Sequence, residues 1–359
     1  MKIAQITSSL ELKLGGPPKV AVSVHDELAK YYEITTLVFG KNHLIKSNVI
    51  AGNAIFGNVY GLVFSPFLKT SRDQILDSNI VLAHGYYLFS TLMAIFNNPN
   101  QKTFIMPHGS LEIYQEKRSR LRKAFYNQIV KIISKQKIIH WLVASESEKD
   151  SIKAKFPDAI VDVVGIGIKV EDVSTFKSLQ NTSGGVNLFT YSRIAEKKRI
   201  DVCINLLSLL IKSFPKTHLD IVGEGKQSLV NMLKKQTEGL NLSNHVTFHG
   251  HVERISQIDF KFQSPIFLLT SESENFAIAV CESIASGIPV IVTKEVAMHK
   301  FVELHNVGVV VDKLSLSELA SAVETVIKNY ESLRMNCVSS AHLLDWNQIM
   351  YNWKRAFSI

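Results

Sequence analysis

A chain of 359 residues is longer than one hydrophobic core usually supports, so we expect two domains. Hydrophobic residues make up 46% of the chain and charged residues 20%, a balance that is typical of globular proteins and argues against intrinsic disorder. The net charge is +8 at pH 7, and the cysteines, Cys203, Cys281 and Cys337, have no paired spacing that would indicate a disulfide framework or a zinc site.

The N-terminal stretch MKIAQITSSLELKL lacks the continuous apolar core of a signal peptide, because Gln5 and Ser8 interrupt it. No run of about 18 apolar residues occurs anywhere, so we expect no membrane-spanning helix. Together with the unpaired cysteines, this predicts a cytoplasmic protein, with a peripheral position on the inner face of the cytoplasmic membrane as a further option.

Residues 1–168 alternate short strand-like runs with helical patterns. Strands are predicted over 2–7, 34–39, 79–84, 102–107 and 138–145. Helical patterns cover 19–32 and 145–156, and the second begins with a capping-box signature, Ser145 followed by Glu148. Strands that alternate with helices predict a parallel sheet with right-handed crossovers, that is, a Rossmann-like domain.

Several residues at the ends of these strands are candidates for function. Gly15 and Gly16 lie between the first strand and the first helix, where glycine lets the backbone approach a ligand, although a lone pair favours a plain turn. His84 ends the strand over 79–84, and His108 follows the strand over 102–107. A histidine in such a place is as often structural as catalytic.

The segment 111–137 accounts for most of the basic character. The window 101–156 holds twelve Lys and Arg against five Asp and Glu. Leu121, Phe125, Ile129 and Ile132 have the spacing of one apolar helix stripe. The remainder is largely cationic: Lys117, Arg118, Arg120, Arg122, Lys123, Lys131 and Lys135. Such a helix either packs its stripe on the core with a solvated basic face or rests on an anionic membrane.

The pattern lapses between 166 and 186 into polar, glycine-ended sequence, which we interpret as a linker. Strands are then predicted over 186–192, 217–223, 245–250, 264–271, 289–293 and 307–312, with helices over 199–213, 226–238 and 315–331. We therefore expect a second doubly wound domain over 186–340, which faces the first across a cleft. The last segment, 341–359, is amphipathic and is expected to pack back toward the N-terminal domain.

The segment YSRIAEKKRID (191–201) follows the first strand of the second domain. Arg193 and Lys198 lie five positions apart across a strand-to-helix turn, so both side chains are expected to reach one site. Fixed cations there would stabilise a phosphate leaving group as it gains negative charge. The alternative is an exposed basic turn without function.

The segment SESENFAIAVCESIASGIPVIV (271–292) places two acids in an apolar stretch. We expect a helix to start near Phe276, where unpaired N–H groups could bind an anion such as a diphosphate. Glu274 would lie at its entrance and Glu282 eight residues on, about 12 Å along the axis if the stretch is helical throughout, so each could accept hydrogen bonds from one ring of a sugar nucleotide. Alternatively, Glu274 is a helix cap and Glu282 a solvated residue, although apolar neighbours make that costly for Glu282.

Glu274 and Glu282, followed by Gly287 and Pro289, resemble the E-x7-E signature of retaining GT-B glycosyltransferases of family 4 (group 1), of the kind that builds bacterial surface polysaccharides. The resemblance implies that Glu274 contacts the hydroxyls of the donor sugar and that Glu282 contacts the ribose. It assigns the backbone between them to the sugar and phosphate: Asn275, Phe276, Ala277 and Ile278. Ala277 stands where glycine is usual in the family.

Two further segments resemble motifs of the same family. YSRIAEKKRID is similar to G-R-L-x-x-x-K-G, with Ser192 and Arg199 in place of the glycines, which implies that Arg193 and Lys198 bind phosphate. FHGHVE (248–253) is similar to the F-x-G-x-V loop, which implies that the backbone of Gly250, His251 and Val252 brackets the nucleobase.

The resemblance also gives roles to the N-terminal candidates. It implies that Gly15 and Gly16 belong to a glycine-rich loop over the donor phosphates, and that His108 faces the donor sugar near the reacting carbon. The resemblance does not cover His84, which we place nearer the acceptor side.

These features predict an α/β protein of the GT-B class with two Rossmann-like domains, the first binding the acceptor and the second the nucleotide sugar. The predicted activity is retaining transfer of a hexosyl group from a UDP- or GDP-sugar to a glycan or lipid-linked oligosaccharide in the synthesis of O-antigen, capsule or lipopolysaccharide. The catalytic candidates are His108, Arg193, Lys198 and Glu274. No Asp-x-Asp occurs, so we expect neither metal nor cofactor, with cationic side chains in the role of the ion.

Two other functions remain open. A GT-B sugar-nucleotide epimerase would share the same fold and donor site. A non-enzymatic module that binds membranes or nucleic acid through its basic segment would leave Glu274 and Glu282 unexplained, and we expect no nucleic-acid partner. A NAD-dependent dehydrogenase is disfavoured, because no G-x-G-x-x-G follows the first strand of either domain.

Overall fold

The computed structural model describes the chain except for residues 12–15, 41, 43, 46, 52–65, 99–101, 113–119, 136, 171–184, 263 and 359. The chain divides into two compact units. Unit 1 comprises Met1–Ile166 and Ile349–Ile359, and unit 2 comprises Gly167–Gln348. Most of the predicted linker falls on 171–184 and so lies outside the described residues.

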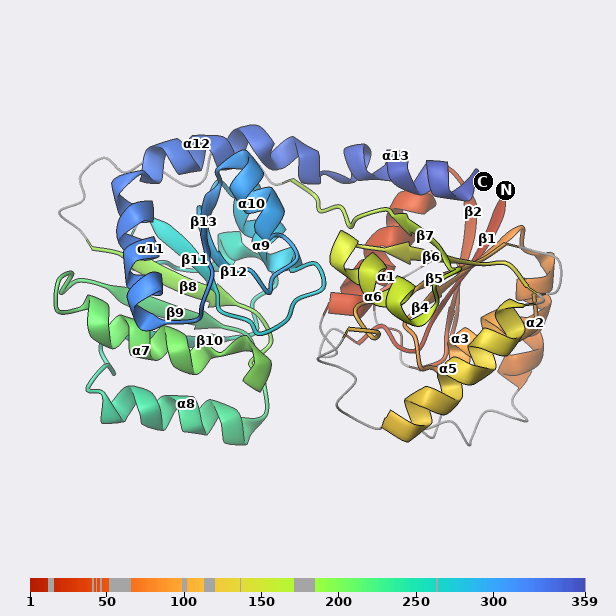
Figure 1. Cartoon of the computed structure of the whole chain (residues 1–359), viewed down its shortest axis with the longest axis horizontal. Helices are drawn as coiled ribbons and strands as arrows, with labels where there is room; N and C mark the ends of the chain where they lie inside the picture. The colour runs from red at the N-terminus through yellow and green to blue at the C-terminus, as the bar shows by residue number, and fades with distance from the viewer. Residues whose placement is uncertain are drawn as a thin grey trace. The chain divides into compact units, whose positions relative to one another are not determined.

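Unit 1 is built on a seven-stranded parallel sheet with the order β3-β2-β1-β4-β5-β6-β7. Figure 1 shows the strands and helices of both units. Its strands are β1 (Lys2–Thr7), β2 (Glu33–Val38), β3 (Val49–Ala51), β4 (Ile80–His84), β5 (Lys102–Met106), β6 (Ile139–Val143) and β7 (Ile160–Val163). The strand order reverses between β1 and β4, where Ile3 pairs with both Ile34 and Ile80. The edge strands β3 and β7 were not predicted, because each is short and only partly buried.

Helices cover both faces of this sheet. They are α1 (Gly16–Leu28), α2 (Pro66–Asp77), α3 (Phe89–Phe96), α5 (Arg120–Ser134), α6 (Glu146–Lys155) and α13 (Trp346–Phe357), of which the residues from Ile349 on belong to unit 1. Phe357 packs edge-on against Phe104 of β5, and Trp353 Nε1 donates to Gly165 O over 3.3 Å. The C-terminal residues are thus part of the unit 1 core.

Unit 2 contains a six-stranded parallel sheet with the order β10-β9-β8-β11-β12-β13. Its strands are β8 (Asn187–Tyr191), β9 (His218–Val222), β10 (Val246–Gly250), β11 (Pro265–Leu269), β12 (Val290–Thr293) and β13 (Gly308–Val311). The α-helices are α7 (Ile200–Leu210), α8 (Gln227–Gly239), α9 (Ile278–Ala285), α10 (His299–His305), α11 (Leu316–Lys328) and α12 (Tyr330–Ser340). Short 3₁₀ helices occur at η4 (Glu196–Lys198), η5 (Ile255–Gln257) and η6 (Ala341–Leu344).

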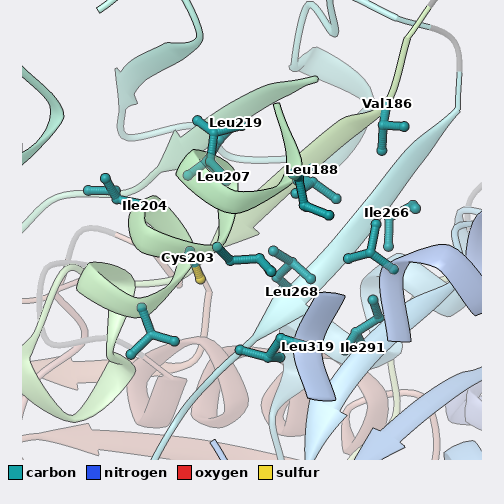
Figure 2. Packing of buried hydrophobic residues seen from close by; sticks show 14 of the residues in the cluster. Val186, Leu188, Cys203, Ile204, Leu207, Leu219, Ile266, Leu268, Ile291 and Leu319 are labelled. Carbon is teal, nitrogen blue, oxygen red and sulfur yellow. The ribbon is translucent and has the colours of Figure 1, made fainter. Parts of the chain in front are cut away.

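The buried strands of unit 2 send alternate side chains to two separate clusters. Leu188 and Leu268 pack with Leu207 of α7 and with α11, and Figure 2 shows this cluster from close by. Their neighbours Phe189 and Phe267 lie in the second cluster, with α9 and α10. Both faces of the sheet are therefore buried, as the near-continuous apolar strands require.

The predicted fold class is confirmed: each unit is a doubly wound, parallel α/β structure. The helix predicted over 315–331 is present as α11, which ends at Lys328, and a further helix that was not predicted, α12, starts at Tyr330. No helix in the described part of the chain is long and apolar enough to cross a membrane. Open sheets of this kind bind ligands at the carboxyl ends of their strands, where the strand order reverses, which directs attention to β8 and β11.

Candidate functional site

The segments that follow β8 and β11 lie side by side at the carboxyl edge of the unit 2 sheet. Glu272 N donates to Lys197 O over 2.9 Å, and Thr270 Oγ1 donates to Lys198 O over 3.0 Å. These bonds join the two segments although they are more than 70 positions apart. The loop after β8 is therefore held in place by the loop after β11.

A buried ion pair lies at the centre of this site. Lys198 Nζ is 2.5 Å from Glu274 Oε1, and the two side chains are 13% and 12% exposed. Lys197 Nζ lies 3.6 Å from the same oxygen and donates to Ser273 O over 3.2 Å. The sequence predicted roles for Lys198 and Glu274 but not their contact, and it did not single out Lys197.

Positive charge exceeds negative charge around this pair. Burial alone would raise the pKa of Glu274, but Lys198 and Lys197 outweigh it and hold the pKa below its ordinary value. Burial lowers the pKa of Lys198 more than Glu274 raises it, and the charges of Lys197 and Arg193 lower it further. Arg193 is exposed, and its charge is close enough to lower the pKa of Lys198; that both side chains serve one site stays a prediction.

Arg199 adopts a backbone conformation that usually requires glycine. Its φ is +49°, in the left-handed region, which costs a residue with a side chain about 1–2 kcal/mol. Its guanidinium forms ion pairs with Asp201 at 3.0 Å and with Glu272 at 3.1 Å, which offset that cost. Because two acids neutralise Arg199, it does not add to the excess of positive charge at Lys198.

The helix after β11 begins later than predicted. Ala277 has φ +63° and precedes α9, whose first residue is Ile278, two residues after the predicted start near Phe276. The reason is the left-handed turn at Ala277, which periodicity does not reveal. Glu274 therefore lies outside the helix, and the separation of 12 Å from Glu282 does not apply.

Backbone bonds, rather than the helix, fix Glu274. Its N–H donates to Glu295 O and its carbonyl accepts from Ala297 N, each over 3.1 Å. The side-chain oxygen of Asn275 is buried and has no hydrogen-bond partner among the described residues. An unpaired polar atom at this place is suited to a ligand. Glu282 lies partly buried in the second turn of α9.

The loop after β10 is held by a residue that the sequence analysis did not consider. The hydroxyl of Tyr191 lies 3.0 Å from Val252 O and 2.7 Å from Glu253 O, and it donates toward both. Gly250 has φ +73° and ends β10, while His251 is exposed. Tyr191, at the end of β8, thus couples this loop to the segment that carries Lys198.

In unit 1, the glycine pair is only partly described. Gly15 lies outside the described residues, and Gly16 is the first residue of α1 rather than a loop residue before it. The helix starts three residues earlier than predicted, because Pro17 and Pro18 are tolerated in a first helical turn.

The two histidines of unit 1 form a direct pair. His84 Nδ1 is 2.9 Å from His108 Nε2, with the rings nearly parallel. Burial lowers the pKa of His108 to about 4, and burial together with His108 lowers the pKa of His84 well below its ordinary value. Both rings are therefore neutral near pH 7. The pair shares a hydrogen bond and carries no charge.

The helix α5 does not pack its predicted apolar stripe against the core. Leu121, Phe125 and Ile132 are 89%, 71% and 55% exposed, and contact with the core comes instead from Val130, with Tyr126 partly buried. Of the basic residues, Lys117 and Arg118 lie outside the described residues. The packing of the stripe on the core is thus contradicted: the helix presents apolar side chains to the outside.

Within the described ranges, no group of three or more His, Cys, Asp or Glu side chains is arranged to hold a metal ion. The functional groups of unit 2 are the cations beside Glu274, the loop of Gly250 and the start of α9. The cations and the start of α9 offer positive charge and backbone donors, which suit an anionic ligand.

The sequence of this chain resembles those of known glycosyltransferases. The family model described as "Glycosyl transferases group 1" matches residues 151–342. An uncharacterized glycosyltransferase from Haemophilus influenzae is 24% identical over 357 residues, covering 95% of each chain.

Solved structures support the fold. HepE from Anabaena, in a complex with UDP and glucose, superposes with a TM-score of 0.78 at 16% identity and covers 100% of this chain and 99% of its own. WaaG, a glycosyltransferase involved in lipopolysaccharide biosynthesis, superposes with a TM-score of 0.69 at 13% identity, with 99% of each chain covered. These neighbours have the GT-B fold, which the present chain shares.

Proposed function

The chain belongs to the group 1 glycosyl transferases, and on that premise we propose that it is a retaining, metal-independent enzyme of family 4. It transfers a hexosyl group from a UDP- or GDP-sugar to a glycan, a lipid-linked oligosaccharide, in the synthesis of a cell-surface polysaccharide. The observation that carries this proposal is the excess of positive charge around Glu274, where Arg193, Lys197 and Lys198 accompany a single carboxylate.

This arrangement suits a nucleoside diphosphate as leaving group. As the bond between the sugar carbon and the phosphate oxygen breaks, the electron pair stays on the phosphate, and fixed cations stabilise the charge without reorganisation. The departing phosphate accepts the proton of the acceptor hydroxyl on the same face of the sugar, so the configuration is retained. Lys198 and Arg193 then serve where other enzymes use a divalent ion.

The remaining groups of unit 2 bind the donor. Glu274, whose carboxylate is held by its ion pair with Lys198, is assigned to the sugar hydroxyls. The ribose is assigned to Glu282, and the base to the loop around Gly250. The backbone groups assigned to the sugar and phosphate belong to Asn275, Phe276, Ala277 and Ile278.

We assign hydrogen-bonding roles to the unit 1 histidines. His108 contacts the donor sugar near the reacting carbon. His84 lies on the acceptor side of His108 and is hydrogen-bonded to it. Because the pKa of His108 is lowered to about 4, its ring donates or accepts a hydrogen bond but does not act as a cation near pH 7.

The first experiment is a thermal-shift panel of UDP, GDP and their hexose conjugates. A donor that binds the folded protein raises its melting temperature, and we expect one nucleotide series to do so. That donor is then incubated with and without acceptor. Transfer only in the presence of acceptor supports the proposal, formation of a new sugar nucleotide without acceptor indicates an epimerase, and the absence of any stabilisation contradicts a donor site.

We further propose that α5 rests on an anionic lipid surface, which would bring the enzyme to a lipid-linked acceptor. The support is the exposure of Leu121, Phe125 and Ile132 on a helix with exposed cations at Arg122 and Lys131. Apolar side chains can enter the headgroup region, while each Lys or Arg near an anionic surface contributes about 1 kcal/mol.

Flotation with vesicles tests this surface. We expect binding to vesicles with anionic phosphatidylglycerol and little binding to neutral phosphatidylcholine. The variant Leu121→Gln with Phe125→Gln should lose most of that binding. The control, Leu304→Gln, changes a leucine that is 80% exposed in α10 of unit 2 and should bind as the wild type does. Equal binding by all three proteins would contradict the role of α5.

A further inference from the structure

Two side chains of α6 hold the turn that carries His108: Lys155 donates to Leu111 O over 2.7 Å, and the buried carboxylate of Glu148 accepts from the turn. Gly109 N donates to Glu148 Oε1 over 2.6 Å, and Ala144 N donates to Glu148 Oε2 over 3.0 Å. Glu148 is 0% exposed. Its own N–H donates to Ser145 Oγ over 3.3 Å, which confirms the predicted cap, but its side chain reaches across to a residue 39 positions earlier.

The turn needs such support because its backbone is strained. His108 and Gly109 both have positive φ, +54° and +74°. The left-handed region costs His108 about 1–2 kcal/mol, so the residue remains there only where its surroundings hold it. Ser110 contributes two hydrogen bonds, since its N–H and its hydroxyl both donate to Pro107 O, but both bonds lie within the turn itself. Glu148 links the turn to a separate element.

The position of His108 decides which group meets His84. In this backbone conformation His108 Nε2 lies 2.9 Å from His84 Nδ1. We propose that Glu148 is a positioning residue for His108: by accepting the Gly109 amide, it fixes the turn and so the direction of the His108 ring. This inference rests on the proposed function, in which His108 contacts the donor sugar.

The variant Glu148→Gln tests the inference. Glutamine keeps the size of the side chain but replaces one acceptor oxygen with an NH2 group that cannot accept an amide hydrogen. We expect kcat for transfer to fall about 10- to 100-fold, because a shift of the His108 ring from its position against the substrate lowers the rate by about that factor. The donor KM should change little. The matched control is Ser145→Ala, which weakens the start of the same helix and leaves the Gly109 bond in place. Its kcat should stay close to that of the wild type.

A second background separates positioning from a general effect on folding. In protein that carries His108→Asn, the group that Glu148 positions is gone, so adding Glu148→Gln should lower kcat no further. If Glu148 had only a structural role, Glu148→Gln would lower kcat by the same factor in both backgrounds. That result would overturn the proposal.

A spectroscopic readout is independent of the enzymatic activity. Nitrogen NMR of labelled histidines should show that Glu148→Gln shifts the ring signals of His84 and His108, whereas Ser145→Ala does not. If the wild type transfers no sugar but the signals shift, the proposed function fails and the positioning role stands. Unchanged ring signals overturn the positioning role. If Glu148→Gln does not fold, Glu148→Asp, whose shorter side chain cannot span both amides, is measured in the same way.

Discussion

The carboxyl edges of the two sheets both hold buried polar side chains, but with opposite electrostatics. At the edge of unit 2, Lys198 and Glu274 form an ion pair with Lys197 beside it. At the edge of unit 1, His84 and His108 form a hydrogen-bonded pair of neutral rings. Similar topology therefore does not impose a similar charge.

The difference shows what burial permits. A buried charge is costly unless an opposite charge accompanies it, and Glu274 has two cations within 4 Å. Neither imidazole supplies an opposite charge to the other, so burial keeps both rings uncharged. We conclude that the unit 2 edge is built to meet a charged ligand, and that the unit 1 pair is built to direct hydrogen bonds.

The largest effect on this difference between the two edges is expected when the charge of Lys198 is removed. In Lys198→Met we expect transfer to fall at least about 100-fold, because a cation aimed at the leaving group is lost. The free energy of unfolding should also fall, by up to about 3 kcal/mol, since Glu274 keeps only Lys197 as a partner. Activity assays and urea unfolding measure the two effects.

Two variants serve as controls for that experiment. Lys212→Met removes the same charge from an exposed position and should change neither quantity. The double variant Lys198→Met with Glu274→Gln removes both charges and should recover stability without recovering activity. Near-normal turnover in Lys198→Met would refute the catalytic role of the cation.

Acid should distinguish the two edges by the pH at which each loses stability. The pKa of His108 is about 4 in the folded protein and near 6.5 when unfolded, so the unfolded state binds more protons between these values. Stability is therefore lost as pH falls from 6.5 to 4, by on the order of 3 kcal/mol. Glu274 has a lowered pKa, so its contribution persists above 4.5 and is lost only below it.

Melting temperatures of the wild type and of His108→Asn between pH 7.5 and pH 4.5 measure this difference. Asparagine tolerates positive φ and has no group that titrates in this range, so the variant should lose less stability on acidification. Equal losses in both proteins would show that His108 is not the group that titrates.

A smaller effect is expected at Tyr191, which supports donor binding rather than chemistry. Tyr191→Phe removes the hydroxyl bond to the loop at Val252, worth about 1 kcal/mol, so the donor KM should rise about 5-fold with kcat unchanged. Steady-state kinetics over a range of donor concentrations separate the two parameters. Tyr351→Phe, at an exposed tyrosine of α13, is the control, and a fall in kcat at Tyr191 would place it in the chemical step.

The smallest expected effect concerns the left-handed residues of the two edges, His108 and Ala277. Ala277→Gly should stabilise the protein by about 0.5 kcal/mol, because glycine relieves the strain but adds entropy to the unfolded chain. Ala279→Gly, in α9, should destabilise it by about 1 kcal/mol, since glycine weakens a helix. Chemical denaturation of the pair checks the sign, and effects of the same sign would contradict strain at Ala277.

The sequence alone was sufficient to place four of the candidate residues after strands, although it placed Gly16 in a loop and the structure has it in α1. Arg193 and Lys198 follow a strand, as predicted, and so do Glu274 and His108. The alternation of strands and helices also predicted two doubly wound units. These features are local, because periodicity and polar strand ends depend on neighbouring residues only.

Only the tertiary structure decided which of these residues meet. Lys198 and Glu274 are 76 positions apart, and strand order alone brings β8 beside β11. The same holds for Glu148 and Gly109, and the left-handed turn at Ala277, which shortened the predicted helix, is equally invisible in the sequence pattern. Contacts of this kind depend on the order and register of distant strands and on backbone angles, whereas the spacing of apolar residues reports only on which face each side chain lies.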